Sequence, residues 1–153
     1  MRAFALVVVL VVLTGVAAAT PVAVLRIEPG GRTYALGDGE RYEYSYQQSI
    51  YQVPVIEEHE RVGDTLRILR VRSRDLRAVE YFRWDGQIRR EGDEFVQDAP
   101  SNSVPALAIR ITTEGAQRLR GAHVDITLRA EFGETVVTVT PAYVPAIALL
   151  SGR

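Results

Sequence analysis

The sequence predicts an all-β protein, an antiparallel β-sandwich or a partly open barrel of short strands with little helix. No stretch of residues 20–153 keeps an apolar period of 3.6 residues over three helical turns, whereas apolar and polar residues alternate repeatedly with a period of two. Turn signals rich in glycine and proline recur about every 8 to 12 residues, as in sandwiches and barrels. Because no internal repeat or low-complexity linker interrupts this pattern, we expect residues 20–153 to form a single β-rich domain.

The first half of this domain divides at clear turn signals. Glu28–Gly31 and Gly37–Gly39 end the first two expected strands, and Gly63-Asp64 separates the fourth from the fifth. Pro54 stands near the start of its strand, where a missing N–H group is tolerated. The expected strands are Val22–Ile27, Thr33–Leu36, Glu40–Gln47, Val53–Val62 and Thr65–Arg72.

The second half follows the same logic. Asp85-Gly86 is a strong signal for a two-residue hairpin, Asp98–Pro105 is an expected loop, and Thr113–Gly121 is expected to hold one short helical turn. Val144–Leu150 is apolar but too short to span a membrane, and we expect it to close a sheet or to cover the core. The expected strands are Ala78–Trp84, Gln87–Arg90, Glu94–Gln97, Ala106–Thr112, Val124–Ala130 and Thr135–Thr140.

Residues 1–19 have the organisation of a signal peptide. Met1-Arg2 supplies a positive charge, an apolar run follows, and Ala17 and Ala19 form a small-residue cleavage pattern before Thr20. The alternative is a retained membrane anchor, since the 17 residues Ala3–Ala19 reach the lower limit for a membrane-spanning helix. Both interpretations predict an exported domain, in the periplasm or on the outer face of the cytoplasmic membrane.

Composition excludes several classes of function. The 18 basic residues are all arginines, 19 residues are acidic, and the net charge of −1 argues against a nucleic-acid-binding domain. The lack of cysteine excludes disulfides, thiolate metal sites, a cysteine nucleophile and a lipoprotein anchor. No nucleophile elbow or phosphate-binding loop is present either. We therefore predict a protein that is not an enzyme and uses no cofactor.

Glu57 and His59 are the first candidate binding residues. On a strand these two side chains share a face, where a carboxylate and an imidazole can meet a metal ion or a proton. A zinc site needs three or four ligands, and the only other histidine, His123, is distant in the sequence. The structural interpretation, which we favour, is a charged strand face that resists aggregation.

Arg70, Arg72 and Arg74 form the second candidate site. Their spacing places three guanidinium groups on one strand face, and guanidinium groups bind carboxylates or phosphates through paired hydrogen bonds. An anionic ligand is one interpretation. The favoured alternative is that the arginines are exposed and pair with acidic side chains on neighbouring strands.

The tyrosines Tyr42, Tyr44 and Tyr46 form the third candidate. At strand spacing they share one face, where they either cover the core or line a groove for an apolar or sugar-like ligand. We favour the core interpretation because aromatic side chains at this spacing usually pack between sheets.

The segment Tyr44-Ser45-Tyr46-Gln47-Gln48-Ser49-Ile50-Tyr51-Gln52-Val53-Pro54-Val55-Ile56-Glu57 resembles the family known as domain of unknown function eighteen-fifty. Members typically carry a strand, then His-Ser, then Pro-Val-x-Glu, and Ser49, Pro54, Val55 and Glu57 match that pattern. The run Val104–Arg110 is also similar to the family. Gln48 replaces the family's histidine, and the glycine-rich stretch expected near residues 73–78 is missing.

The resemblance implies a small exported protein of a kind often encoded beside the fused membrane subunit of a tripartite (TRAP-type) solute transporter, and it implies no enzymatic activity. Gln48 does not titrate near neutral pH as a histidine does, so this position supports no proton-linked or metal-linked role here. Pro54 indicates an irregular crossing from Gln48 to Val53. Within it, Ser49 and Glu57 either bind a partner or hold the loop through hydrogen bonds to its backbone.

Two hypotheses for function follow. In the first, the protein is a non-enzymatic accessory that docks on a membrane transporter subunit or on its solute-binding protein. In the second, it is a small β-sandwich that binds an anionic solute itself. The candidate binding residues for both are Gln48, Ser49, Pro54, Glu57, His59, Arg70, Arg72 and Arg74.

Overall fold

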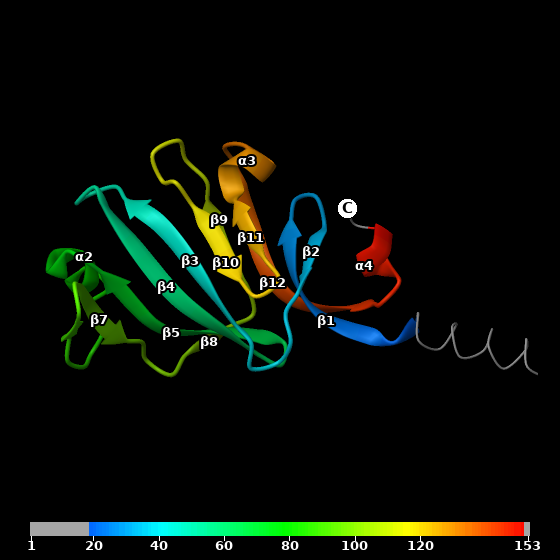
Figure 1. Ribbon diagram of the computed structural model, residues 1–153, viewed down its shortest axis with the longest axis horizontal. Helices are drawn as coiled ribbons and strands as arrows, with labels where there is room; N and C mark the ends of the chain where they lie inside the picture. The colour runs from blue at the N-terminus through cyan, green and yellow to red at the C-terminus, as the bar shows by residue number, and fades with distance from the viewer. Residues whose placement is uncertain (1–18, 152–153) are drawn as a thin grey trace, which may run out of the picture.

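The computed structural model describes residues 19–151 and consists mainly of two antiparallel sheets (Figure 1). The smaller sheet has the strand order β2-β1-β12-β9. Its strands are β1 (Pro21–Glu28), β2 (Arg32–Ala35), β9 (Leu107–Arg110) and β12 (Val136–Pro145). Strands β1 and β12 pair over the whole of β1, from Pro21 opposite Pro145 to Glu28 opposite Thr138. The prediction of an all-β, sandwich-like fold is confirmed.

The larger sheet has the order β11-β10-β3-β4-β5-β7-β6, and β8 pairs with the other end of β5. Strands β3, β4 and β5 are its long centre, and β4 shifts register at Glu58/His59 through an irregularity against β5. The strands are β3 (Arg41–Gln48), β4 (Val53–Val62), β5 (Thr65–Ser73), β6 (Arg89–Glu91), β7 (Glu94–Asp98), β8 (Ser103–Val104), β10 (Arg118–Gly121) and β11 (Asp125–Thr127).

Two hydrophobic clusters cover the inner face of the larger sheet. The first joins both sheets, with Leu25 and Val139 of the smaller sheet packed in one cluster with Tyr42, Leu66 and Leu119 of the larger. The second lies beneath helix α2 (Leu76–Glu80), whose Ala78 and Val79 pack with Val55 and Val71. Figure 1 shows α2 at one end of β4 and β5, and the smaller sheet toward the other end.

Four local predictions were wrong. Ala78–Trp84 is not a strand, because Asp75 caps the backbone N–H of Arg77 at 3.0 Å and α2 forms instead. The hairpin of this region closes at Gly92, between β6 and β7, and not at Asp85-Gly86. Residues 118–121, expected to belong to a segment with a short helical turn, pair with β3 and form strand β10. The strand expected over Val124–Ala130 ends early, at helix α3 (Leu128–Phe132).

The two ends of the chain are described unequally. The predicted leader covers residues 1–19, of which 1–18 lie outside the described residues. At the other end β12 continues to Pro145, and the backbone N–H of Ala146 donates to the carbonyl of Thr20 at 2.9 Å before helix α4 (Ala148–Ser151). Over residues 19–151, every helix is too short or too polar to cross a membrane.

Candidate functional site

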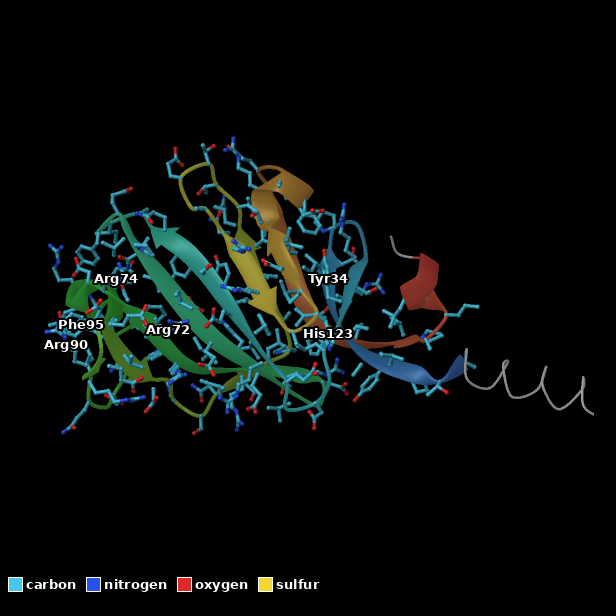
Figure 2. All side chains as sticks on the ribbon, viewed as in Figure 1. Tyr34, Arg72, Arg74, Arg90, Phe95 and His123 are labelled. Carbon is cyan, nitrogen blue, oxygen red and sulfur yellow. The ribbon has the colours of Figure 1, made fainter. Side chains whose placement is uncertain are left out.

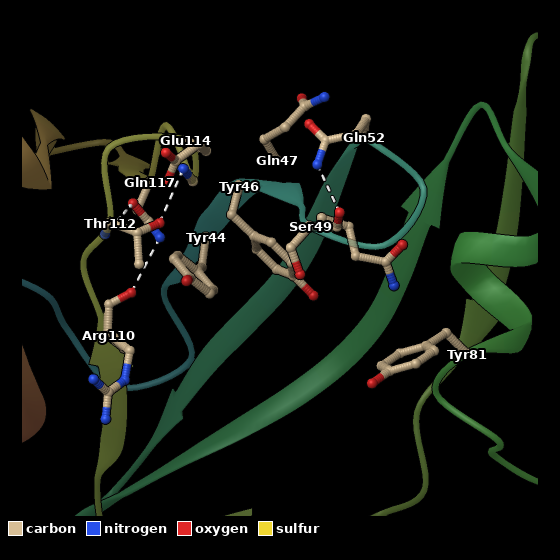
Figure 3. A pocket seen from close by; sticks show the side chains of 12 residues that line it. Tyr44, Tyr46, Gln47, Ser49, Gln52, Tyr81, Arg110, Thr112, Glu114 and Gln117 are labelled. Carbon is tan, nitrogen blue, oxygen red and sulfur yellow. Dashed lines mark hydrogen bonds between the residues drawn. The ribbon is translucent and has the colours of Figure 1, made fainter.

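A groove of about 530 Å³ lies on the inner face of the larger sheet, between the loop that joins β9 to β10 and the C-terminal end of α2 (Figure 3). Three tyrosines, Tyr44, Tyr46 and Tyr81, contribute aromatic rings to it. Its remaining lining residues are Gln47, Gln48, Ser49, Gln52, Arg110, Thr112, Glu114, Gly115 and Gln117. A volume of this size is typical of sites for small molecules.

Strand alternation places the tyrosines of β3 on this face. The ring of Tyr42 is buried in the first hydrophobic cluster, whereas Tyr44 and Tyr46 are half-buried and stack on each other with ring centroids 5.0 Å apart. The predicted tyrosine stripe therefore does both things: one ring fills the core and two line the groove.

A buried polar pair lies beside these rings. Glu57 and His59 of β4 are opposite Tyr44 and Tyr42, and the Glu57 Oε2 atom lies 3.1 Å from the His59 Nε2 atom. The His59 ring stacks on Tyr42 at a centroid distance of 5.1 Å. Glu57 and His59 share a face as predicted, but the favoured interpretation of a solvated, charged strand face is wrong, because both side chains are buried and bonded to each other.

The charge of Glu57 influences the groove through the tyrosines. Burial raises the pKa of Tyr44 and Tyr46 well above the usual range, and repulsion between a phenolate and the Glu57 carboxylate raises it further. Hydrogen bonding between the side chains of Tyr46 and Glu57 adds to the effect. Both tyrosines consequently remain protonated at neutral pH and offer hydroxyl groups and not phenolates.

Gln48 is the most unusual residue of the lining. Its side chain is only 5% exposed, and within residues 19–151 neither its amide nitrogen nor its amide oxygen has a hydrogen-bond partner. Strand alternation places it on the same face as Tyr44 and Tyr46. A buried amide without partners is costly to the folded protein, by about 1–3 kcal/mol, and such a group needs an explanation.

The wall opposite β3 is formed by residues 110–117, which the sequence interpretation missed. Gln117 is buried, and its amide nitrogen donates to the carbonyl of Arg110 at 3.1 Å. The backbone N–H of Gln47 donates to the carbonyl of Gly115 at 2.6 Å, which ties this wall to β3. No local signal marks these residues, because their position follows from the pairing of β10 with β3.

The loop between β3 and β4 is tighter than expected. Gln48 pairs with Val53, so residues 49–52 form a hairpin turn and not an irregular crossing. The side chain of Gln52 closes this turn by donating to the carbonyl of Ser49 at 2.6 Å. Pro54 is exposed, and its carbonyl accepts from the Ser73 hydroxyl at 2.7 Å. Glu57 does not hold this loop, because its carboxylate meets His59 within β4.

Arg70 and Arg72 lie on the opposite face of the larger sheet. Arg70 Nε donates to Glu58 at 2.6 Å, and Arg72 bridges Glu94 at 2.8 Å and Glu43. Hydrogen bonds to these carboxylates raise the pKa of Arg72 against the opposing effect of burial. Both guanidinium groups thus have carboxylate partners within the sheet.

Arg74 lies beyond the end of β5, is exposed and makes no ion pair within residues 19–151. Figure 2 shows Arg72 and Arg74 toward the α2 end of the larger sheet and His123 far from them. His123 is exposed, and its nearest carboxylate is that of Glu40 at 4.0 Å. Among residues 19–151 there is no group of three histidine, aspartate or glutamate side chains arranged to hold a metal ion.

Fold and site together define a two-sheet antiparallel β-protein with a groove of tyrosine and glutamine side chains on the inner face of its larger sheet. Comparisons with protein-family models, with curated proteins and with solved structures find no match to this chain. The resemblance to domain of unknown function eighteen-fifty therefore stays a prediction.

Proposed function

We propose that this protein is a non-enzymatic binding domain that holds a small molecule in the groove of Tyr44, Tyr46 and Tyr81. The observation that carries the proposal is the groove itself, about 530 Å³ in volume and lined by aromatic, amide and hydroxyl side chains. Aromatic walls with a few directed polar groups are the usual composition of ligand sites. The unpartnered amide of Gln48 supports the same function, because a ligand would satisfy it.

Binding without catalysis agrees with the state of the ionisable groups. Glu57 and His59 are 9% and 3% exposed and bonded to each other, and neither belongs to the lining of the groove. Tyr44 and Tyr46 stay protonated because burial and the Glu57 charge raise the pKa of both. The protonated tyrosine hydroxyl groups can orient a ligand and donate hydrogen bonds to it, as a recognition site requires.

Tyr81→Ala tests the groove with little effect on the fold, because the Tyr81 side chain is 53% exposed. The backbone N–H of residue 81, which caps α2, is kept in this variant. The purified protein is screened by thermal shift against sugars, organic acids, amino acids and nucleosides. We expect at least one class to raise the melting temperature of the wild type, and Tyr81→Ala to abolish that shift.

The matched control is Tyr143→Ala, since Tyr143 is 54% exposed and lies outside the groove. It should keep the ligand-induced shift. A shift that Tyr81→Ala leaves intact would show that binding occurs elsewhere, and a wild type that no class stabilises would overturn the proposal.

We further propose that the domain is exported and serves as an accessory of a TRAP-type membrane transporter. The support is the leader pattern of residues 1–19 and the similarity of Tyr44–Glu57 to an exported family. Crosslinking in native membranes, followed by identification of the captured protein, tests this association. Capture of the transporter's membrane subunit or its solute-binding protein supports it, and their absence among the captured proteins refutes it.

A further inference from the structure

We propose that the ligand of the groove is a neutral polyhydroxylated ring, a monosaccharide or a disaccharide. This inference rests on the proposed binding function and names the chemical class of its ligand. It follows from three properties of the lining: the kinds of side chain present, the balance of charge, and the amide of Gln48.

The lining contains no aliphatic side chain. Of its 12 residues, three are tyrosines, four are glutamines, two carry hydroxyl groups, two are charged and one is glycine. A purely apolar ligand would leave the amides and hydroxyl groups without partners, at a cost for each buried group. Sugar rings instead present C–H faces that pack on aromatic rings and hydroxyl groups that bond to amides.

The charges of the groove balance. Arg110 and Glu114 both line it, both are exposed, and neither takes part in an ion pair within residues 19–151. Glu57, on the neighbouring strand β4, is bonded to His59 and does not belong to the lining. An anionic ligand would gain one guanidinium group and oppose one carboxylate, so a lining without net charge favours a neutral ligand.

Gln48 supplies the decisive polar contact. Its amide has a free donor and a free acceptor, both buried, on the same strand face as the tyrosine rings. A hydroxyl group both donates and accepts, so one or two neighbouring sugar hydroxyls satisfy both atoms of the amide. A carboxylate only accepts and would leave the amide oxygen unpaired.

Tyr46 and Tyr81 provide the aromatic surfaces. In Figure 3 their side chains approach the groove from β3 and from the end of α2, with Ser49 and Gln52 beside Tyr46 and Arg110 and Gln117 beyond Tyr44. The Tyr46 ring stacks on that of Tyr44 with centroids 5.0 Å apart, which orients it. A ring-shaped ligand in this groove therefore meets aromatic surface and amide groups from separate segments.

The test uses Gln48→Met and a matched variant, Gln97→Met. Methionine keeps the length of the glutamine side chain and removes the unpartnered amide, so Gln48→Met should raise the melting temperature of the free protein by about 4 °C. The Gln97 amide, outside the groove, donates to the carbonyls of Trp84 and Gly86 at 2.9 and 3.3 Å. Gln97→Met should lower the melting temperature and leave ligand affinity unchanged.

Binding is measured by calorimetry with glucose, galactose, mannose, maltose, glucuronate, betaine and the dipeptide Ala-Ala. We expect at least one neutral sugar to bind wild type and Gln97→Met equally, and Gln48→Met at least about tenfold more weakly. Glucuronate should bind more weakly than glucose. A neutral sugar that binds Gln48→Met as well as wild type would overturn the role of the amide.

The outcomes separate the two proposals. Binding of glucuronate, betaine or the dipeptide in the groove, without binding of any neutral sugar, would overturn the ligand class and leave the binding function standing. Tyr81→Ala identifies binding in the groove in that case. No binding by any of the seven compounds, together with no stabilisation in the thermal-shift screen, would overturn both.

Discussion

Arg61 carries the sharpest prediction about stability. Its side chain is 0% exposed and has no carboxylate partner within residues 19–151, so carbonyl groups and the ring of Tyr143, whose centroid lies 4.7 Å from the guanidinium carbon, surround the buried charge. Its Nη1 atom donates to the carbonyls of Val24 at 2.8 Å, Leu36 at 3.3 Å and Ala142 at 3.0 Å. Val24 belongs to β1 and Ala142 to β12, so this guanidinium group joins the larger sheet to the smaller one.

The expected cost of Arg61→Met follows from these bonds. Each of three buried carbonyls loses a charged donor, at about 1–2 kcal/mol apiece, and the bond from Nε to Gly63 at 3.0 Å is lost as well. Relief of the guanidinium's desolvation and the apolar methionine offset part of this loss. We expect a net loss of about 3–5 kcal/mol in the free energy of unfolding, a large fraction of the roughly 5–15 kcal/mol typical of a domain.

Urea unfolding of the purified protein measures this change. The fluorescence of Trp84, the single tryptophan, reports the cluster beneath α2, and circular dichroism reports the sheets. Arg120→Met is the control, because Arg120 is exposed and makes no ion pair within residues 19–151, and it should change stability by less than about 0.5 kcal/mol. If Arg61→Met is as stable as wild type or more so, the buried charge is a burden and our account of the link between the sheets is wrong.

Three further predictions concern the groove. The free energy of unfolding should fall as pH rises above 10, by up to about 1.4 kcal/mol per pH unit for each of Tyr42, Tyr44 and Tyr46. Burial raises the pKa of each tyrosine in the folded state, so the unfolded chain releases these protons at lower pH than the folded protein does. The sequence has no lysine to titrate in this pH range. Tyr46→Phe should therefore reduce the slope of the free energy of unfolding against pH, measured by urea unfolding at several pH values. An unchanged slope would contradict the contribution assigned to Tyr46. Glu57→Gln removes the charge that repels the phenolates, so ultraviolet titration should show these tyrosines ionising at lower pH than in wild type. Gly115→Ala places a Cβ atom 1.9 Å from the Gln117 amide and breaks its bond to Arg110, which should cost about 1–2 kcal/mol in urea unfolding, whereas Gly37→Ala meets nothing closer than 3.5 Å and should cost less.

The β3–β4–β5 part of the fold was predictable because its alternation is strong. Tyrosines alternate with polar residues along β3, and Gly63 turns β4 into β5 with positive φ. The segment Ala78–Trp84 was mispredicted because apolar residues alternate there too, while the Asp75 cap and contact with Val55 and Val71 favour a helical turn. A short apolar run suits either structure until its packing partner is known.

The candidate site was predictable only on one wall. The sequence placed Gln48, Ser49 and the tyrosines near one another, because they follow each other along one strand and its turn. Nothing local linked them to Tyr81 or to Arg110–Gln117, since these segments reach the groove through strand pairing and through the packing of α2. Likewise, Glu58 and Glu94 became partners of Arg70 and Arg72 only through the register of the sheet.

The sequence by itself determined the all-β class, the alternation that gives each strand two faces, and the charge balance of the chain. The tertiary structure alone decided that Gln48 is buried without partners, that Arg61 joins two sheets, and that one groove collects three tyrosines. The physical reason is that alternation is a property of neighbouring residues. Burial, desolvation and hydrogen-bond satisfaction depend instead on which distant segment arrives opposite each side chain.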